Sequence, residues 1–302
     1  TVRAPATVSN VVCGFDCLGF ALERPFDELT LRKIAGPPKV RIINRDQFGL
    51  PEAPEKNVAG VTLLAMLDAA NVDFAFELES AKQIKPGSGI GSSAASACGA
   101  AVAANALLDN RYNAGELIEF ALEGEKLASG ARHADNVAPC ILGGFILVRS
   151  SSPLDIVQLS FPKIYAAVIH PQIEIKTAEA RNVLPENVPL ATAVRNWANL
   201  GALVASLASG DLELLSRSLE DEIVEPTRSH LIPKFAELKN ASLASGALGG
   251  GISGSGPSVF MLTADLDTAG RVEKEMRTVY SATGIEFCTY VSEISSFGAA
   301  VV

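Results

Sequence analysis

One stretch constrains this chain more than any other: KPGSGIGSSAASA, residues 85–97. Its glycines, at 87, 89 and 91, free the backbone to adopt positive φ and to approach a ligand closely. Upstream, residues 74–79 alternate apolar and charged side chains, which predicts a half-buried strand. Downstream, small helix-favouring residues from Ser92 to about Leu108 predict a helix. A glycine loop between a strand and a helix N-terminus presents unpaired N–H groups to an anion, so we expect a phosphate-binding site here.

The loop differs from two well-known phosphate-binding patterns. It is not a Walker A loop, because no Lys-Ser or Lys-Thr pair follows Gly91. It is not the dinucleotide fingerprint, because Gly91 comes two rather than three residues after Gly89. A plain glycine-rich turn is the alternative. Ser92 and Ser93 favour the phosphate site, since hydroxyls at a helix start can cap backbone donors or reach a metal ion.

Length and charge exclude several classes of protein. With 302 residues the chain can form two domains and a large core. Its net charge of −9 argues against nucleic acid and anionic membranes as partners, because both attract basic surfaces. No run of 18 apolar residues predicts a membrane span, and the first residues lack the apolar segment of a signal peptide. The five cysteines form no CxxC pair and are expected to be reduced thiols in a cytoplasmic protein.

The order of the expected elements indicates an α+β fold rather than a doubly wound sheet. Residues 29–34 and 40–44 flank a Gly-Pro-Pro turn and predict a β-hairpin. Helices are expected over residues 56–70 and 113–129. The stretch Ser-Ser-Ser-Pro at 150–153 is the best boundary signal, and Pro162 is an alternative position for the join itself. We expect domains at residues 1–158 and 159–302.

Two polar features point to chemistry. On the helix over 113–129, Glu125 shares the apolar side with Ile118 and Leu122, and an inward carboxylate is costly unless a cation neutralises it. A local pair with Lys126 or Arg132 is one interpretation, and ligation of a metal together with Ser93 is the other. His133 lies beside an Asp and an Asn in a segment expected to be a loop, where a structural and a functional role are equally open.

Three motifs then follow one another along the chain: a segment ending in Gly14-Phe15-Asp16, the loop 86–94, and a second glycine-rich stretch, GISGSGPS, at 251–258. In this order they resemble the GHMP kinases, and the resemblance covers nearly the whole chain. Motifs at 6–10, 132–139, 177–181 and 225–228 are similar to those of the homoserine kinase branch. The resemblance implies a two-domain α+β fold, N-terminal ribosomal-protein-S5-domain-2-like and C-terminal ferredoxin-like, with the site in the cleft between the domains.

The resemblance also implies ATP and Mg²⁺ and assigns residues to each part of the site. The phosphate cradle would be Pro86, Gly87, Ser88, Gly89, Ile90, Gly91, Ser92 and Ser93, with Asn57 lining the nucleoside pocket. Ser93 and Glu125 match the Mg²⁺ ligands. The amino-acid substrate would be held by Asn10, Asp16, His133, Asn136, Thr177, Arg181 and Arg228. The charges agree with this assignment, because Asp16 can accept an ammonium while Arg181 and Arg228 offer planar donors to a carboxylate.

The expected reaction is transfer of phosphate from ATP to the hydroxyl of homoserine. Asn136, Arg181, Ser93 and Glu125 are the residues expected to carry it. Asn136 cannot take a proton, and the neighbouring Asp135, on a segment expected to be extended, should point elsewhere. We therefore expect direct in-line attack without a protein base, with the rate coming from positioning and charge neutralisation.

Three alternatives stay open at this point. Another kinase of the family could use a different small acceptor such as mevalonate, although Asp16 would then meet no ammonium. A catalytically inactive sensor of nucleotide and ligand would not need to keep both Ser93 and Glu125. A generic anion-binding protein is the third alternative. The resemblance also implies a homodimer.

Overall fold

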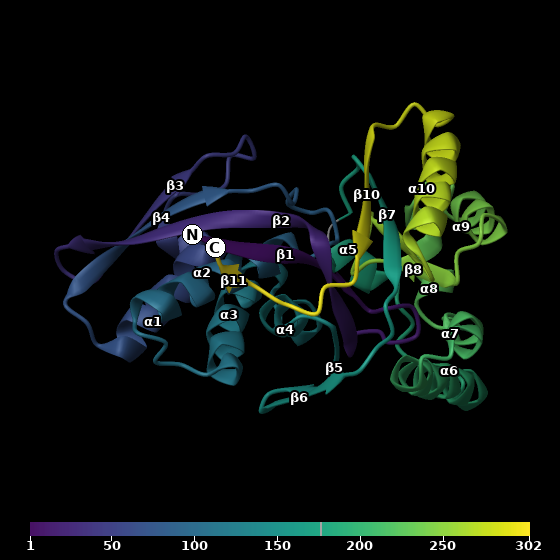
Figure 1. Ribbon diagram of the computed structural model, residues 1–302, viewed down its shortest axis with the longest axis horizontal. Coiled ribbons are helices and arrows are strands. Elements are labelled where there is room, and N and C mark those ends of the chain that lie inside the picture. The colour runs from purple at the N-terminus through teal and green to yellow at the C-terminus, as the bar shows by residue number, and fades with distance from the viewer. Residues whose placement is uncertain (176) are drawn as a thin grey trace.

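The longest strand, β2 (Leu18–Ala35), organises the N-terminal half of the computed structural model, which describes residues 1–175 and 177–302. The sheet runs in the order β11-β1-β2-β4-β3, and β5 pairs with β2 and with β6. Its other strands are β1 (Val2–Ser9), β3 (Val40–Asn44), β4 (Phe74–Ala81), β5 (Phe145–Ser151), β6 (Leu154–Leu159) and β11 (Ala300–Val301). Below this sheet in Figure 1 lie the helices α1 (Val58–Ala70), α2 (Ser92–Leu107), α3 (Ala114–Ser129) and α4 (Ala134–Leu142).

A second, wholly antiparallel sheet forms the C-terminal half, in the order β10-β7-β9-β8. Its strands are β7 (Tyr165–Pro171), β8 (Gly249–Ile252), β9 (Val259–Thr263) and β10 (Phe287–Glu293). The helices of this half are α5 (Thr177–Asn182), α6 (Leu190–Ser209), α7 (Leu212–Ser218), α8 (Glu225–Arg228), α9 (Phe235–Ala244) and α10 (Leu266–Ser281). Short 3₁₀ turns are η1 (Pro54–Lys56) and η2 (Ser229–Leu231). The expected α+β class is confirmed, and within the described ranges no helix has the length and apolar character that a membrane crossing requires.

The expected hairpin between residues 29–34 and 40–44 is wrong. The second half of β2 pairs antiparallel with β4, and β3 lies on the outer side of β4, parallel to it. Each strand alternates as expected, but alternation does not say which neighbour a strand takes. Strand β4 therefore lies beside β2, in the position that the hairpin assigned to β3. It begins 30 residues after the end of β3.

One hydrophobic cluster joins the two halves. It includes Val8 and Phe20 from the first sheet and Phe260 and Leu262 from the second, all fully buried. The rings of Phe20 and Phe260 meet edge-to-face with centroids 5.6 Å apart. After β10 the chain returns to the first sheet, where β11 pairs with β1. A continuous hydrophobic core therefore connects the two halves.

Candidate active site

A cavity of about 320 Å³ lies between the halves and takes its lining from both. The first half contributes the glycine loop, the start of α2, and residues from β3, β4 and α3. The second half contributes Arg181, Arg228 and Gly254. This is the size and position expected of a small-molecule site at a junction between domains.

The glycine loop has the geometry that the sequence predicted. Gly87, Gly89 and Gly91 all have positive φ, at 74°, 82° and 70°. A side chain at Gly89 would lie 2.6 Å from the carbonyl oxygen of Gly256, and one at Gly91 would lie 2.0 Å from Thr7 Oγ1. Only glycine fits at either position. Gly91 is also the N-cap of α2 and no side chain caps that helix, so its first N–H groups are available to an anion.

The second glycine stretch supports the first. Ser258 Oγ donates to the Ser88 carbonyl oxygen at 2.6 Å, and Ser253 Oγ donates to the Gly89 carbonyl oxygen at 2.7 Å. Residues 251–258 therefore have a structural role in the site, because these two hydrogen bonds fix the position of the glycine loop. Of the predicted cradle, Pro86, Gly87, Gly89, Gly91, Ser92 and Ser93 line the cavity. Ser88 and Ile90 are fully buried and do not line it.

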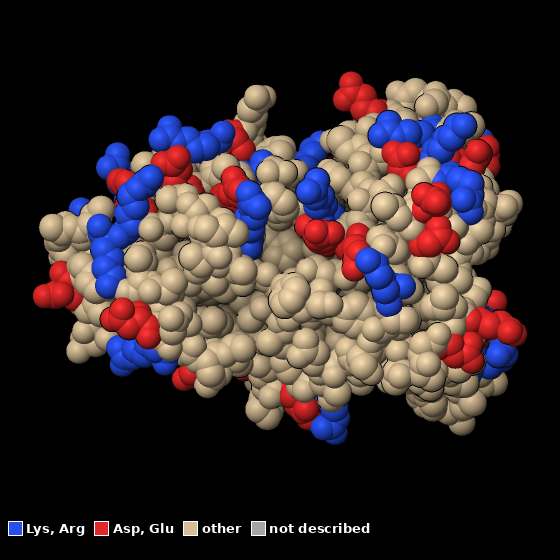
Figure 2. Space-filling view, viewed as in Figure 1, with Lys and Arg blue, Asp and Glu red and all other residues tan. Residues whose placement is uncertain are grey.

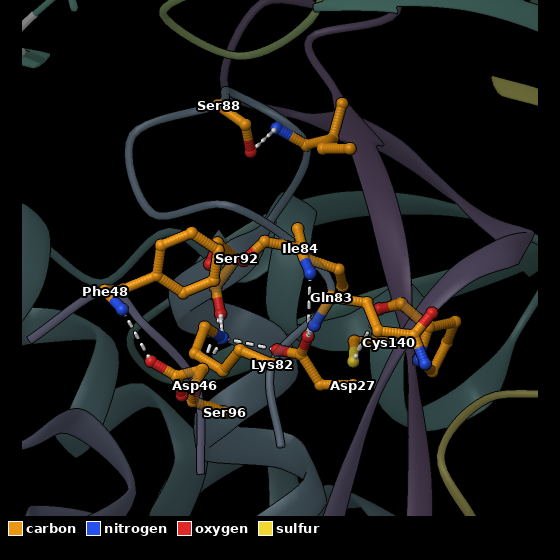
Figure 3. Close-up of polar contacts among 12 residues, drawn as sticks. Asp27, Asp46, Phe48, Lys82, Gln83, Ile84, Ser88, Ser92, Ser96 and Cys140 are labelled. Carbon is orange, nitrogen blue, oxygen red and sulfur yellow. Dashed lines mark hydrogen bonds and ion pairs between the residues drawn. The ribbon is translucent and has the colours of Figure 1, made fainter. Parts of the chain in front are cut away.

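A buried ion pair closes the base of the loop, and the sequence reasoning missed it. Asp27 Oδ1 accepts the backbone N–H groups of Gln83 at 2.8 Å and Ile84 at 2.9 Å, just before the loop. Its other oxygen pairs with Lys82 Nζ, which donates to the Ser92 carbonyl oxygen at 3.0 Å, just after the loop (Figure 3). The side chains of Asp27 and Lys82 are 0% and 2% exposed. The pair, which we call the loop clasp, therefore connects both ends of the glycine loop.

The two residues predicted to hold Mg²⁺ line the same cavity. Glu125 is only 5% exposed and projects from α3, and Ser93 lies in the first turn of α2. Arg132, one of the alternative partners for Glu125, instead pairs with Glu119 and with Glu123, the latter at 2.7 Å. Among the described residues no group of three or more His, Cys, Asp or Glu side chains could hold a metal. One carboxylate and one hydroxyl beside a phosphate cradle fit Mg²⁺, which is usually held by one or two carboxylates together with substrate phosphates.

Two residues of opposite charge, Asp16 and Arg181, also line the cavity. Arg181 Nη2 donates to both carboxylate oxygens of Asp16, at 2.8 and 2.9 Å. The ring of Phe15 lies 5.6 Å from the Arg181 guanidinium and 5.0 Å from that of Arg228, so both cations contact the same aromatic ring. Both side chains of the ion pair are about 40% exposed, at 40% for Asp16 and 37% for Arg181. A zwitterionic ligand could take over both partners.

The loop that carries Asp16 has a strained backbone. Asn10, Val11 and Val12 have φ of 71°, 40° and 62°, a conformation that β-branched residues rarely adopt. Asn10 stabilises the loop, since its Oδ1 accepts the N–H of Asp16 at 3.0 Å and its Nδ2 donates to the Gly254 carbonyl oxygen at 2.7 Å. Such strain persists only where the surroundings hold it, and it is common at ligand sites.

His133, Asp135 and Asn136 lie at the start of α4, so the expected extended segment is wrong there. Asn136 is fixed by its neighbours, with Oδ1 accepting from Thr7 Oγ1 at 2.8 Å and Nδ2 donating to Ser9 Oγ at 2.9 Å. Asp135 lines the cavity as well, and burial together with the nearby Asp16 raises the pKa of its carboxyl to about 7. Burial lowers the pKa of His133, whose Nδ1 lies 4.0 Å from Asp16.

Asn57, predicted to line a nucleoside pocket, lines the cavity but uses its side chain internally. Its Nδ2 donates to the Pro51 carbonyl oxygen at 2.7 Å and its Oδ1 caps α1 through Gly60 N at 3.2 Å. It therefore fixes the segment that forms part of the cavity wall, which Ile42 and Leu78 also line. The side chain of Thr177, also predicted to touch substrate, lies outside what the structure describes.

Comparison with known proteins agrees with this geometry. Residues 57–144 match the family model for the GHMP kinases N terminal domain, and residues 202–282 match that for the GHMP kinases C terminal. The chain is 44% identical, over 99% of its length and 98% of the relative's, to the homoserine kinase of Chlorobium phaeobacteroides strain BS1. The chain belongs to the GHMP kinase family, in its homoserine kinase branch. The resemblance carried by the three sequence motifs is confirmed.

Solved structures of GHMP kinases have the same fold. The crystal structure of homoserine kinase from Cytophaga hutchinsonii superposes with a TM-score of 0.95, at 46% identity over 100% of this chain and 96% of that one. An L. major mevalonate kinase in complex with R-mevalonate gives a TM-score of 0.71 at 18% identity, over 96% of this chain and 94% of that one. The second match shows only a shared fold. The two-domain fold implied by the resemblance is therefore confirmed.

Proposed function

We propose that this GHMP kinase transfers the γ-phosphoryl group of ATP to the side-chain hydroxyl of L-homoserine, giving O-phospho-L-homoserine for threonine biosynthesis in the cytoplasm. The observation that carries the proposal is the pairing of Asp16 with Arg181 in the lining of the cavity. This pair offers one group to an ammonium and one to a carboxylate. The phosphate cradle of Gly87, Gly89 and Gly91 lines the same cavity.

The acceptor is expected to bind by exchanging partners within this ion pair. Its ammonium would take the place of Arg181 at Asp16, and its carboxylate would bind Arg181 and Arg228, whose guanidinium groups both contact the ring of Phe15. An acceptor with a carboxylate but no ammonium, such as mevalonate, would leave Asp16 without a cation. We therefore expect an amino acid to be preferred, because it pairs the carboxylate of Asp16 as well as the arginines, and an unpaired charge is costly in a partly desolvated site.

On the nucleotide side, the uncapped start of α2 and the loop amides would hold the phosphates. Ser93 and Glu125 would hold Mg²⁺, which supplies charge neutralisation for the phosphoryl group when bound. Effective molarity from holding hydroxyl and phosphate together can contribute roughly 7–11 kcal/mol to lowering the barrier. We propose in-line attack without a protein base, because Asn136 cannot accept a proton. Asp135 lines the cavity after all, so its carboxyl is the group on which that proposal is tested.

The direct test is an assay of ADP formation with Mg²⁺ and ATP in the presence of homoserine, of mevalonate, or of neither. Homoserine-dependent ADP, with a stoichiometric phosphorylated amino acid in the mass spectrum, is the expected result. Faster turnover with mevalonate would overturn the assignment of the acceptor. ADP formation that no acceptor stimulates, despite measurable nucleotide binding, would instead indicate a ligand sensor. We further propose that the kinase acts as a homodimer.

A further inference from the structure

The outer face of α6 is unusually apolar for a surface helix. Three large side chains on it are exposed: Leu190 at 71%, Val194 at 51% and Trp197 at 60%. At 100° per residue, these three share an arc of about 80° with three small residues, Gly201, Ala205 and Ala208, which are also exposed. We call these six residues the α6 stripe. It is about 27 Å long at 1.5 Å per residue and contains no polar side chain.

The rest of the helix does not explain the stripe. The opposite side, with Leu203 and Leu207, is the one that packs on the core. α6 lies in the half of the molecule away from α1, at the lower right of Figure 1, and the lower part of that lobe is drawn without Lys, Arg, Asp or Glu in Figure 2, with a cluster of both charges above it at the right edge. An uncharged stripe of this length, of the order of several hundred Å², is typical of an interaction surface rather than of ordinary exposed surface.

The charge next to the stripe is already neutralised. Arg195 is exposed on the flank of α6, and its Nε donates to both carboxylate oxygens of Glu222, each at 2.7 Å. Neither group is therefore left to recognise a charged partner. This favours an occupant that is apolar along a matching length, as a second stripe of the same kind would be.

The order of large and small residues along the α6 stripe favours a second copy of the same stripe as its partner. The bulky residues occupy the first half of the stripe and the small ones occupy the second half, with the change between Trp197 and Gly201. A two-fold axis near position 199 would place two copies of α6 antiparallel. Trp197 of one copy would then face Gly201 of the other, Val194 would face Ala205, and Leu190 would face Ala208. A side chain added at Gly201 would meet no atom within 4 Å, so space for the partner's indole exists there.

We propose that the α6 stripe is the two-fold interface between two copies of this chain, with the helices antiparallel and crossing near position 199. An interface made of the same patch on both copies is the commonest way in which soluble proteins form dimers. The tryptophan in a desolvated central position is the type of residue that dominates binding energy at such interfaces. The inference rests on the homodimer stated above and is independent of the proposed catalysis.

The only tryptophan of the chain is Trp197, so its emission reports on this surface alone. We expect the emission maximum to move to shorter wavelength with increasing protein concentration, with the same midpoint as dimer formation in sedimentation velocity. Val194→Glu should leave a monomer whose emission stays that of exposed indole. Leu266→Glu, a matched control at a 55% exposed position on α10, should leave the dimer unchanged.

Disulfide trapping tests the orientation of the helices. In a Cys288→Ser background, which removes the exposed native thiol, Val194→Cys together with Ala205→Cys should give a covalent dimer under mild oxidation. The two positions are about 16 Å apart along one helix, too far to bridge within a chain. Val194→Cys alone should not cross-link, because the antiparallel arrangement keeps the two copies of position 194 about 15 Å apart.

Four results would overturn the inference. A protein that sediments as a monomer at 100 µM removes both the dimer and its interface. A dimer that survives Val194→Glu, or that forms without any change in the emission of Trp197, uses another surface. Cross-linking through position 194 alone shows that the helices do not run antiparallel. None of these results would affect the proposed kinase reaction, which the ADP assay tests separately.

Discussion

Replacing Asp27 with Asn tests whether the loop clasp positions the glycine loop. The substitution keeps the size of the side chain and one acceptor oxygen, which can still bind the N–H groups of Gln83 and Ile84. It replaces the oxygen that faces Lys82 Nζ with an NH₂ group. Two donors then face each other in a site where both side chains are at most 2% exposed.

The magnitude follows from this burial. Removing one member of a buried ion pair leaves an uncompensated charge and costs about 3–5 kcal/mol. Lys82 keeps its contacts with the Ser92 carbonyl oxygen and with Ser96 Oγ, so we expect the lower end of that range, about 3 kcal/mol, in urea unfolding. Asp27→Asn combined with Lys82→Met removes the stranded charge as well, and should recover more than half of the loss.

The positioning role is separated from the structural one by kinetics. In the double variant, stability returns but nothing connects the two ends of the glycine loop through charge. We therefore expect the KM for ATP to remain raised by about tenfold or more while the KM for homoserine changes less than twofold. Asp155→Asn is the control, because it breaks an exposed ion pair with Arg149 and should change stability by less than about 1 kcal/mol.

Two outcomes would refute this reasoning. A loss below about 1 kcal/mol for Asp27→Asn would mean that the pair is not desolvated as the structure shows. Recovery of the wild-type KM for ATP in the double variant would mean that Asp27 and Lys82 stabilise the fold without positioning the loop.

Four further predictions concern the site itself. Burial raises the pKa of Asp135 to about 7, above that of an unfolded aspartate, so the folded protein loses stability as pH rises from about 4 through 7. Asp135→Asn should therefore raise Tm more at pH 8.5 than at pH 5.5. An equal gain at both pH values would contradict this. If no protein base is used, the same variant should keep kcat within about tenfold, whereas a loss of 100-fold or more at unchanged KM would identify Asp135 as the base. Glu125→Gln should raise the Mg²⁺ concentration for half-maximal rate by about tenfold or more while Glu123→Gln, on the exposed side of α3, should not, and equal responses would argue against Glu125 as a ligand. Asp16→Asn should raise the KM for homoserine by about 10- to 100-fold with little effect on the KM for ATP, and a change in the ATP constant alone would contradict the assignment.

The parts of the site that depend on local chemistry could be predicted from the sequence. Glycines at alternate positions before a small-residue helix predicted the conformation of the glycine loop, because its positive φ values exclude most other residues. Helical periodicity placed Glu125 on the buried side of α3, where it is 5% exposed. Both inferences needed only the geometry of a single element.

What could not be predicted depends on contacts between distant segments. Asp27 and Lys82 are 55 residues apart, so nothing local pairs them. The one signal in the sequence was alternation along the strands: Asp27 lies two residues from the buried Leu29 and Lys82 two residues from the buried Ser80, so this alternation places each on the buried side. The pairing of β3 with β4 rather than β2 likewise depends on which strand occupies the edge. The helix at Asp135 was hidden by Pro139, a helix-breaking residue that α4 nevertheless contains.

The contact between the two glycine loops has a consequence for biosynthesis of the enzyme. The glycine loop ends at residue 91, but the hydroxyls that hold it come from Ser253 and Ser258, more than 160 residues later. A nascent chain that has left the ribosome only as far as β7 therefore has the loop without its support. We expect such a chain to bind nucleotide poorly, so that ATP capture begins only when translation is nearly complete.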